Sequence, residues 1–553
     1  VGNYIKSFDT KQNEVVVESK GEEITNIVNY IVETAKEENI HIPQLWLPKI
    51  PNTIYISALK QKYHYMIEKN NINPIIGEYD DPDNQKQNVL TLPISKEGNA
   101  IVFGSAGSGK ELMLSSIIYS TITTHDSKEV NFYILDFGAE TLTMFRNAPH
   151  VGDVILSTEK EKIENLFKMI SKILEERKKI FVDYNGSYDF YINHGGKQIP
   201  MIIIVINNIE AFTETYNEYE ELIGQLTRDC LKYGIVFIVS TNGTNTMRYR
   251  LRQNFKQNLV LQFNDASDYG TILSGVRKKE PSKVYGRGLI SLDNIYEFQT
   301  AYAYKEEKLT EYIKIVCEKL NNICKYQAPA VPILPEVVTA SILSDAYTSL
   351  KDIPVGINKD TLEIEKIDII ENNFYIITGE DITSGTSFLT TWINYLSVPS
   401  QVNCIVIDGN SMLNKQEMTS VMYETGENIF TTLTTLINSE NNMNICVITG
   451  LGTILKKLSM VDKGKLTAML GEAKNTKYII IDTIDNIKTL SYEAWFKTNT
   501  SLSEGIWLGN GIANQFTLKV TTNSRILRAE IEPNFGYVIK KGKAILVKFV
   551  TEP

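Results

Sequence analysis

The sequence predicts an α/β fold built from two tandem modules, each a mostly parallel β-sheet covered by helices on both faces. Three observations lead to this prediction. Apolar runs alternate with helical patterns between residues 100 and 298, similar runs return in the same order after residue 372, and a proline-rich stretch lies between. Continuous apolar strands between helices are typical of parallel sheets buried on both sides. At 553 residues the chain is also too long for a single hydrophobic core.

Five core strands are predicted in the first module. They are AIVF (100–103), NFYILD (131–136), MIIIVIN (201–207), IVFIVST (235–241) and NLVLQF (258–263). Four of them have counterparts in the second half, namely NNFYIITG (372–379), CIVIDG (404–409), NICVITG (444–450) and KYIIIDT (477–483). The matched order predicts a second, smaller module of the same class.

The domain boundaries follow from composition. KYQAPAVPILPEV (325–337) carries three prolines and marks the best boundary in the chain. We therefore expect a first module at residues 44–327 and a second at 328–553. Residues 1–43 are expected to be the end of a preceding linker, with an amphipathic helix near Glu22–Lys36.

Composition excludes several classes of function. The formal net charge of −10 and the pI of about 5.4 argue against a global nucleic-acid footprint. No apolar run approaches the ~20 residues of a membrane span. The five cysteines and five histidines are scattered without ligand spacing, so we predict no metal site built from them and a reducing compartment.

A phosphate-binding loop follows the first core strand and opens an apolar helix. Its eight residues are Gly104, Ser105, Ala106, Gly107, Ser108, Gly109, Lys110 and Glu111. They match G-x-x-x-x-G-K-[ST] except at the last position. The backbone N–H groups of such a loop cradle phosphate and its lysine reaches the terminal phosphates. The loop predicts a P-loop NTPase fold with ATP and Mg²⁺ bound at residues 104–111.

Glu111 replaces the hydroxyl that normally contacts Mg²⁺, and it admits two interpretations. Its carboxylate could bind Mg²⁺ directly, because carboxylates are good ligands for hard cations. Alternatively its negative charge weakens triphosphate binding, at a cost of about 1–3 kcal/mol. We favour the second interpretation.

The acidic pair required for hydrolysis is also changed. Asn207 and Asn208 stand where Asp-Glu is expected at the end of the third core strand. An amide can hold water but is neither a base nor a good ligand for a divalent ion. Asp136 could be a substitute metal ligand or a structural cap, and Glu210 lies too far along the chain to replace Asn208 without a change of register. These residues predict a degenerate catalytic site.

The corresponding loop of the second module departs further from the pattern. Residues 379–387 read GEDITSGTS, one residue too long, with two acids and with Thr386 at the lysine position. Two anionic side chains oppose phosphate, so no nucleotide is expected there.

A neighbouring subunit could supply a catalytic arginine in trans, as in ring ATPases. Five arginines late in the first module are candidates for this role, each weighed against a solvated surface position. They are Arg228, Arg248, Arg250, Arg252 and Arg287.

The chain resembles FtsK/SpoIIIE-type ATPases and, more narrowly, the membrane-bound EssC/EccC ATPases of type VII secretion. The segments that carry the resemblance occur in the family's order along residues 41–553. They are QLWLPKIP (44–51), IIGEYDDPDNQKQ (75–87), the loop at 104–111, NAPHVGDVI (147–155), GRGLISLDNIYEFQTA (286–301) and EGIWLGNGIANQ (504–515). The resemblance implies that this chain is the cytoplasmic second and third ATPase modules of a bacterial cell-membrane protein.

The same resemblance implies partners. Such proteins are expected to form hexamers and to receive the C-terminal signals of small helical substrates with a WxG turn, with no nucleic acid involved. For the last module we predict an apolar groove lined by Ile506, Trp507, Leu508 and Ile512, because glycines flank the tryptophan. The alternative is that this run is a buried strand.

Three rival functions stay open at this point. A DNA translocase of the same superfamily would show salt-dependent DNA binding. A competent ATPase would turn over ATP in spite of Glu111. A non-catalytic adaptor would bind no nucleotide at the loop that contains Lys110.

Overall fold

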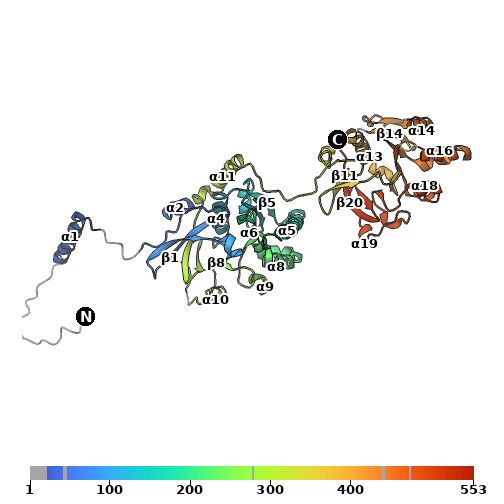
Figure 1. Ribbon diagram of the computed structural model, residues 1–553. Helices are drawn as coiled ribbons and strands as arrows, with labels where there is room; N and C mark the ends of the chain where they lie inside the picture. The colour runs from blue at the N-terminus through green and yellow to red at the C-terminus, as the bar shows by residue number, and fades with distance from the viewer. Residues whose placement is uncertain are drawn as a thin grey trace, which may run out of the picture. The chain divides into compact units, whose positions relative to one another are not determined.

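The structure is a computed structural model that describes residues 22–40, 47–276, 279–400, 402–438, 443–472 and 475–552. The chain separates into two compact units, Val1–Val331 and Pro332–Pro553, and each contains one sheet with helices on both faces (Figure 1). Within the described residues, no helix is long and apolar enough to cross a membrane.

The first unit is built on a ten-stranded mixed sheet. In spatial order its strands are β2 (Lys86–Thr91), β1 (Ile75–Asp81), β10 (Ile295–Thr300), β9 (Arg287–Ser291), β8 (Gln257–Leu261), β3 (Ala100–Phe103), β7 (Ile235–Thr241), β6 (Met201–Asn207), β4 (Val130–Asp136) and β5 (Val151–Leu156). The six strands from β8 to β5 run parallel. The other four extend the sheet in antiparallel fashion. The five predicted core strands are confirmed, whereas the antiparallel part was not predicted.

The second unit repeats this topology strand for strand. Its order is β12 (Ile364–Ile367), β11 (Ile353–Asn358), β20 (Lys543–Phe549), β19 (Phe535–Lys540), β18 (Gly505–Leu508), β13 (Phe374–Gly379), β17 (Thr476–Thr483), β16 (Asn444–Thr449), β14 (Asn403–Asp408) and β15 (Met422–Thr425). Each strand occupies the position of the strand numbered ten lower in the first sheet. The predicted internal repeat is therefore confirmed, and the loop after β13 is the counterpart of the loop after β3.

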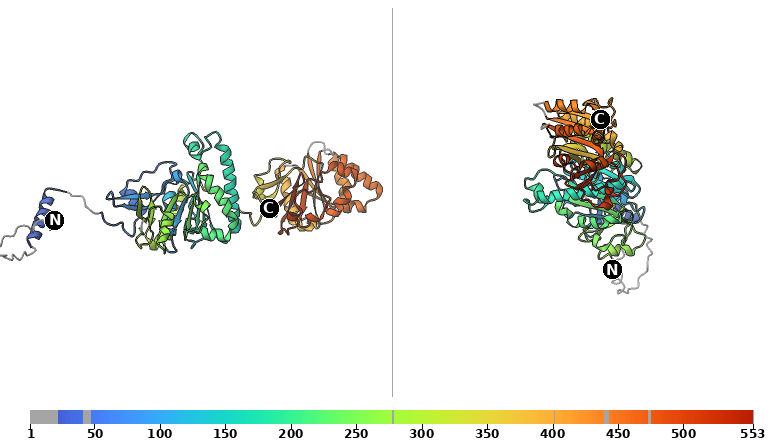
Figure 2. Two further views of the ribbon diagram at one scale, coloured as in Figure 1. Left: turned by 90° about the horizontal axis from the view of Figure 1, so that it is seen from below. Right: turned by 90° about the vertical axis from the view of Figure 1, so that its right-hand side faces the viewer.

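Helices cover both faces of each sheet (Figure 2). In the first unit, one face is covered by α4 (Lys110–Ile122), α6 (Tyr188–Asn193) and α11 (Leu309–Ile323), and the other by α5 (Lys160–Ile180), α7 (Ile209–Thr215), α8 (Glu220–Asp229) and α9 (Tyr249–Arg252). In the second unit, one face is covered by α12 (Ala340–Ser344) and α13 (Thr386–Ser400), and the other by α14 (Ile429–Asn438), α15 (Leu451–Lys457), α16 (Met460–Glu472), α17 (Ile484–Leu490) and α18 (Ala494–Asn499). Shorter helices are α2 (Ile56–Lys62), α3 (Ile94–Glu97), α10 (Ser267–Ile272) and α19 (Ser524–Leu527).

The segment between the two units belongs to the first unit up to Val331. Ala328 donates its backbone N–H to the carbonyl of Pro149 at 2.8 Å, and Tyr133 Oη donates to the carbonyl of Pro329 at 2.9 Å. Val331 is buried among the apolar side chains of the first unit. The first unit thus extends past residue 327, because these backbone groups find their partners there.

The expected N-terminal helix is present as α1 (Glu22–Glu37), and its apolar side chains are exposed. The rest of the expected linker, residues 1–21 and 41–43, lies outside the described residues, as do residues 44–46 of QLWLPKIP.

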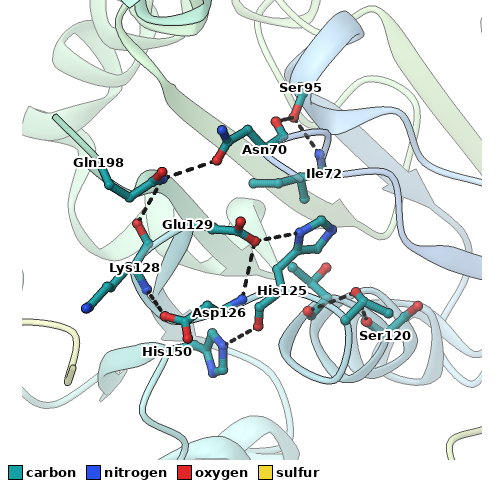
Figure 3. A network of polar contacts seen from close by, with 12 residues as sticks. Asn70, Ile72, Ser95, Ser120, His125, Asp126, Lys128, Glu129, His150 and Gln198 are labelled. Carbon is teal, nitrogen blue, oxygen red and sulfur yellow. Dashed lines mark hydrogen bonds and ion pairs between the residues drawn. The ribbon is translucent and has the colours of Figure 1, made fainter. Parts of the chain in front are cut away.

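A buried polar network joins the end of α4 to β4 and β5 (Figure 3). His125 Nδ1 lies 3.1 Å from Glu129 Oε2, and His150 Nε2 donates to the carbonyl of His125 at 2.8 Å. Both imidazoles are buried, and burial is the main reason that the pKa of each lies below its usual value of 6.5. The folded first unit therefore holds both histidines in the neutral form near neutral pH.

Candidate functional site

The loop at residues 104–109 joins β3 to α4 and has the backbone conformation that a phosphate cradle requires. Gly107 and Gly109 have φ angles of 76° and 102°, which favour glycine. A Cβ at Gly104 would lie 2.4 Å from Ser108 Oγ. Ser108 Oγ itself is buried and has no hydrogen-bond partner among the described residues. This orphaned hydroxyl, together with the N–H groups of the loop, fits an oxygen-rich ligand such as phosphate.

A second chain segment braces this loop. Gly286 donates its N–H to the carbonyl of Ser108 at 3.0 Å, and a Cβ at Gly109 would lie 2.8 Å from Gly286 Cα. Two glycines at this contact are therefore required by the close approach of the two backbones. The loop is held by the sheet extension as well as by its own helix.

Lys110 is folded back onto the loop. Its Nζ donates to the carbonyls of Gly104 at 2.8 Å and of Ser105 at 2.9 Å, and the residue is only 3% exposed. Burial lowers the pKa of Lys110, and the charges of Glu111 and Glu210 oppose that shift. A bound phosphate would exchange two neutral acceptors for an anionic one, which favours its binding.

Asp136 is a structural acceptor at the end of β4. Its Oδ1 accepts from the N–H of Gly138 at 3.2 Å and from Asn207 Nδ2 at 2.8 Å, and its Oδ2 accepts from the N–H of Leu142 at 3.0 Å. It is 1% exposed. Of the two interpretations of this residue, these contacts favour the structural cap.

Asn207 and Asn208 are also engaged within the protein. Asn207 Oδ1 accepts from Ser240 Oγ at 2.8 Å, so its amide bridges Asp136 and β7. Asn208 has a φ of 66°, and its Oδ1 accepts from the N–H of Ala211 at 3.3 Å as the N-cap of α7. Each amide oxygen therefore already accepts a hydrogen bond from within the protein.

Glu210 is the acidic residue that follows Asn208 along the chain. It stands in the first turn of α7, is half-buried, and its charge acts on Lys110. The left-handed turn at Asn208 redirects the chain after β6, and α7 begins at the next residue. Glu210 therefore lies close enough to the loop for its charge to act on Lys110.

The five candidate arginines occupy three different settings. Arg228, Arg248 and Arg250 line one cavity of about 420 Å³, in which Arg248 Nε lies 3.0 Å from Glu220 Oε1. Arg252 donates to the carbonyl of Thr244 and to the carbonyl of Thr271 in α10. Arg287 is buried, and its guanidinium donates to Gln299 Oε1 at 2.8 Å and to the carbonyl of Ile50 at 3.0 Å. The expectation that Arg287 could act in trans is wrong, because its guanidinium is buried and engaged within the chain.

The counterpart loop of the second unit is a short 3-10 helix, Ile382–Gly385, and not an open cradle. Asp381 caps it by accepting from the N–H of Thr383 at 2.9 Å, and hydrogen bonds from Thr383 lower the pKa of Asp381. The Glu380 carboxylate packs directly against Gly511, because a Cβ added to Gly511 would lie 2.4 Å from Glu380 Cδ. Carboxylates and a helical turn take the place of the phosphate-binding N–H groups.

The buried aspartate at the end of β4 has a counterpart in the second unit, Asp408 at the end of β14. Asp408 Oδ1 accepts from Thr449 Oγ1 at 2.6 Å, and its Oδ2 accepts from the N–H of Leu413 at 3.0 Å and from Tyr423 Oη at 2.9 Å. Burial and this bond raise the pKa of Tyr423 to about 12. Both units thus use a buried aspartate at this position to hold neighbouring backbone.

The predicted apolar groove at Ile506, Trp507, Leu508 and Ile512 is wrong. These residues are 0%, 0%, 2% and 2% exposed. Strand β18 lies between β13 and β19, and Trp507 Nε1 donates to the carbonyl of Asn510 at 3.0 Å. The run is a core strand because both faces of the sheet are covered here, which was the alternative interpretation.

Residues 74–278 match the model of the FtsK/SpoIIIE family. The strand order defines the fold class, a pair of tandem P-loop NTPase modules, and the part of the first module that matches the FtsK/SpoIIIE model includes the loop at residues 104–111. More narrowly, the chain is similar to the EccC and EssC proteins of type VII secretion, in agreement with the resemblance carried by its sequence motifs.

The similar proteins and solved structures differ in how much of their own length this chain covers. The ESX secretion system protein EccC of Geobacillus thermodenitrificans is 26% identical over 70% of this chain, and the type VII secretion system protein EssC of Staphylococcus aureus (strain MRSA252) is 24% identical over 73%. The chain spans 26% and 28% of their lengths. ATPases 2 and 3 of EssC from Geobacillus thermodenitrificans superpose with a TM-score of 0.78 at 21% identity, over 92% of this chain and all of that one.

A further solved structure contains a peptide. ATPases 2 and 3 of Thermomonospora curvata EccC, in complex with a signal sequence peptide, match with a TM-score of 0.53 at 20% identity, over 88% of this chain and 94% of that one. The predicted fold class, two tandem P-loop modules, is confirmed by the shared topology.

Proposed function

We propose that this chain is the rear pair of ATPase modules of a membrane-anchored type VII secretion motor, which recognises small helical WxG-type substrates and helps to translocate them. In this proposal the first module is a weak or regulatory ATP site and the second is a non-catalytic module that docks substrate. One observation carries the proposal: two sheets of identical strand order hold a phosphate cradle after β3 and a closed 3-10 turn after β13.

The residues of the first loop fit a nucleotide. The N–H groups of Ala106, Gly107 and Gly109, the orphaned Ser108 Oγ and Lys110 would hold the phosphates, whereas the N–H groups of Gly104, Ser105 and Ser108 donate to carbonyls of the protein. Glu111 stands at the sequence position whose hydroxyl contacts Mg²⁺ in an intact loop, and a bound Mg²⁺ ion would neutralise charge on the transferring phosphate. Asn207 and Asn208 are engaged elsewhere, so the isolated chain is expected to hydrolyse ATP slowly or not at all.

The cavity with Arg228, Arg248 and Arg250 supports assembly into a ring. Three guanidinium groups gathered at one surface hollow, with Glu220 paired to Arg248, are suited to contact an anionic site on a neighbouring subunit. In a hexamer of the complete protein, one of them would supply the arginine in trans.

Because the run at residues 506–512 is buried, we place substrate docking at a different surface of the second module. A hollow of about 400 Å³ lies between α15, α16, α17 and α18. Its apolar lining is Leu455, Met460, Leu490 and Trp495, and its charged lining is Lys456, Lys463 and Glu493. Met460 and the adjacent Val461 are 82% and 81% exposed. An amphipathic helix that carries acidic residues fits this chemistry, and the signal peptide bound by Thermomonospora curvata EccC is the related case.

Nucleotide titration of the purified chain tests the ATP site. We expect ATP to bind to the unmodified chain and to a Thr386→Ala control, and binding to be lost in Lys110→Ala. Equal affinity in all three proteins would contradict the assignment of the site to the first module. No binding to any of them would favour a non-catalytic adaptor.

A competent ATPase is the second candidate function, and Glu210 favours it because its charge reaches Lys110. Turnover above background that is lost in Glu210→Gln would support this function over the weak site. Turnover unchanged by that substitution would remove Glu210 from the candidate residues.

A further inference from the structure

Tyr285 stands at the edge of the phosphate loop, just before the glycine that touches it. A Cβ built on Gly109 would lie 3.6 Å from Tyr285 Cζ, so the phenol ring borders the end of the loop from which α4 begins. Tyr285 is nevertheless 42% exposed. A large aromatic surface is thus presented to solvent beside a phosphate cradle, and none of the contacts described above uses it.

The backbone that carries this ring is held on both sides. The carbonyl of Tyr285 accepts from Gln299 Nε2 at 3.0 Å, and the N–H of Gly286 is bonded to Ser108. The carbonyl of Gly286 accepts from the N–H of Thr300 at 2.9 Å and from its Oγ1 at 2.7 Å. The loop and the tyrosine therefore keep a fixed relative position, which a preformed binding site requires.

The charged groups near the ring are carboxylates, and they keep its hydroxyl protonated. Burial raises the pKa of Tyr285, and the nearby charges of Glu111 and Glu306 raise it further. The ring is therefore a neutral phenol at physiological pH and adds no charge that would oppose a nucleotide. Glu111 opposes the phosphates, so binding there needs a contribution from another part of the ligand.

We propose that Tyr285 stacks on the base of a nucleotide whose phosphates occupy the loop at residues 104–111. The inference rests on the proposed nucleotide site and deepens it by naming the residue that distinguishes a nucleoside triphosphate from an inorganic polyphosphate. Aromatic side chains stack on bases of every type because each base has a π-face. The contact therefore gives affinity for a nucleobase without selecting adenine over guanine.

Two probes separate stacking from a structural role of the ring. ATP and inorganic tripolyphosphate are titrated against the full chain, against Tyr285→Ala and Tyr285→Phe, and against Tyr492→Ala, an exposed tyrosine of the second unit. We expect Tyr285→Ala to weaken ATP binding by about tenfold and to leave tripolyphosphate within about twofold. Tyr285→Phe and Tyr492→Ala should bind both probes as the unmodified chain does.

Two outcomes would overturn the stacking contact alone. Unchanged ATP affinity in Tyr285→Ala would do so, and so would an equal loss for ATP and tripolyphosphate, because a disordered loop weakens both. An unmodified chain that binds neither probe would overturn the nucleotide site itself, together with this contact.

Discussion

The Asn207 amide donates a 2.8 Å hydrogen bond to the Asp136 carboxylate, and both side chains are 1% exposed. The amide at residue 207 thereby pairs with a buried carboxylate on the neighbouring strand. A second carboxylate at residue 207 would face the first across the same distance, and the two charges would repel each other. Asparagine is therefore the better partner for Asp136 at this position.

Asn207→Asp is therefore expected to destabilise the first unit by about 3 kcal/mol, since it places an unpaired charge beside Asp136 in a buried position. Urea unfolding at neutral pH measures the loss. Asn208→Asp is the matched control, because aspartate caps a helix about as well as asparagine and should change stability by less than about 0.5 kcal/mol. Equal effects at residues 207 and 208 would contradict the proposed role of the Asn207–Asp136 bond.

Substitutions of Glu111 distinguish the two interpretations of its carboxylate. If its charge repels the phosphates, Glu111→Gln and Glu111→Thr should both tighten ATP binding by about fivefold. Titrations with and without Mg²⁺ measure this effect. If Glu111 binds Mg²⁺ directly, Glu111→Gln should instead weaken binding, and only when Mg²⁺ is present.

Arg287 connects the sheet extension to the segment before α2. Arg287→Ala should destabilise the first unit by about 2–4 kcal/mol, because Gln299 Oε1 and the carbonyl of Ile50 would lose their buried donor. Thermal or urea unfolding measures the change. The surface substitution Arg228→Ala should lie within about 0.5 kcal/mol of the unmodified chain, and a comparable loss there would contradict this assignment.

The stability of the first unit should depend on pH through His125 and His150. Their folded pKa values lie below the unfolded value of 6.5, so the stabilisation is fully present above that value and is lost as the pH falls below it. The urea midpoint of the first unit is expected to fall between about pH 7.5 and about pH 5.5. The second unit, residues 332–553, contains no histidine in its sequence and is the internal control. A parallel fall in both units would rule out the histidines as the cause.

Substrate docking should be sensitive to the hollow between α15 and α18. Met460→Ser and Lys463→Glu are each expected to weaken the binding of an amphipathic, acidic C-terminal substrate peptide by about tenfold. Fluorescence anisotropy with a labelled peptide measures it. Ile526→Ser changes another exposed apolar side chain of the same unit and should leave affinity unchanged. Unchanged peptide affinity in both Met460→Ser and Lys463→Glu would show that the substrate docks elsewhere.

The parallel core could be predicted from the sequence, whereas the antiparallel extension could not. The strands that flank the loop at residues 104–109 are continuous apolar runs, and their order recurs in the second half. By contrast, β1 pairs with β10 through partners such as Gly77 and Thr300. Local periodicity does not reveal a pairing between segments so far apart in the chain. For the same reason, the contact between Gly286 and Gly109 could not be predicted from the sequence.

The candidate site divides in the same way. The glycines, Lys110 and Glu111 could be identified from spacing alone, because a phosphate cradle is made by consecutive residues. The engagement of Asn207 by Asp136, the burial of Trp507 and the position of Tyr285 beside Gly109 depend on contacts between distant segments. A one-dimensional pattern does not contain those contacts.

The sequence by itself determined that this protein has two tandem P-loop modules and that, of the two corresponding loops, the first alone keeps the G-x-x-x-x-G-K pattern, since both properties depend on consecutive residues. Tertiary structure alone decided which side chains are free to act. Arg287 and Trp507 are buried in the interior, whereas Glu210 and Tyr285 lie near the loop at residues 104–111. The physical reason is that burial and hydrogen bonding depend on what packs against a residue, and that is settled by the folded chain.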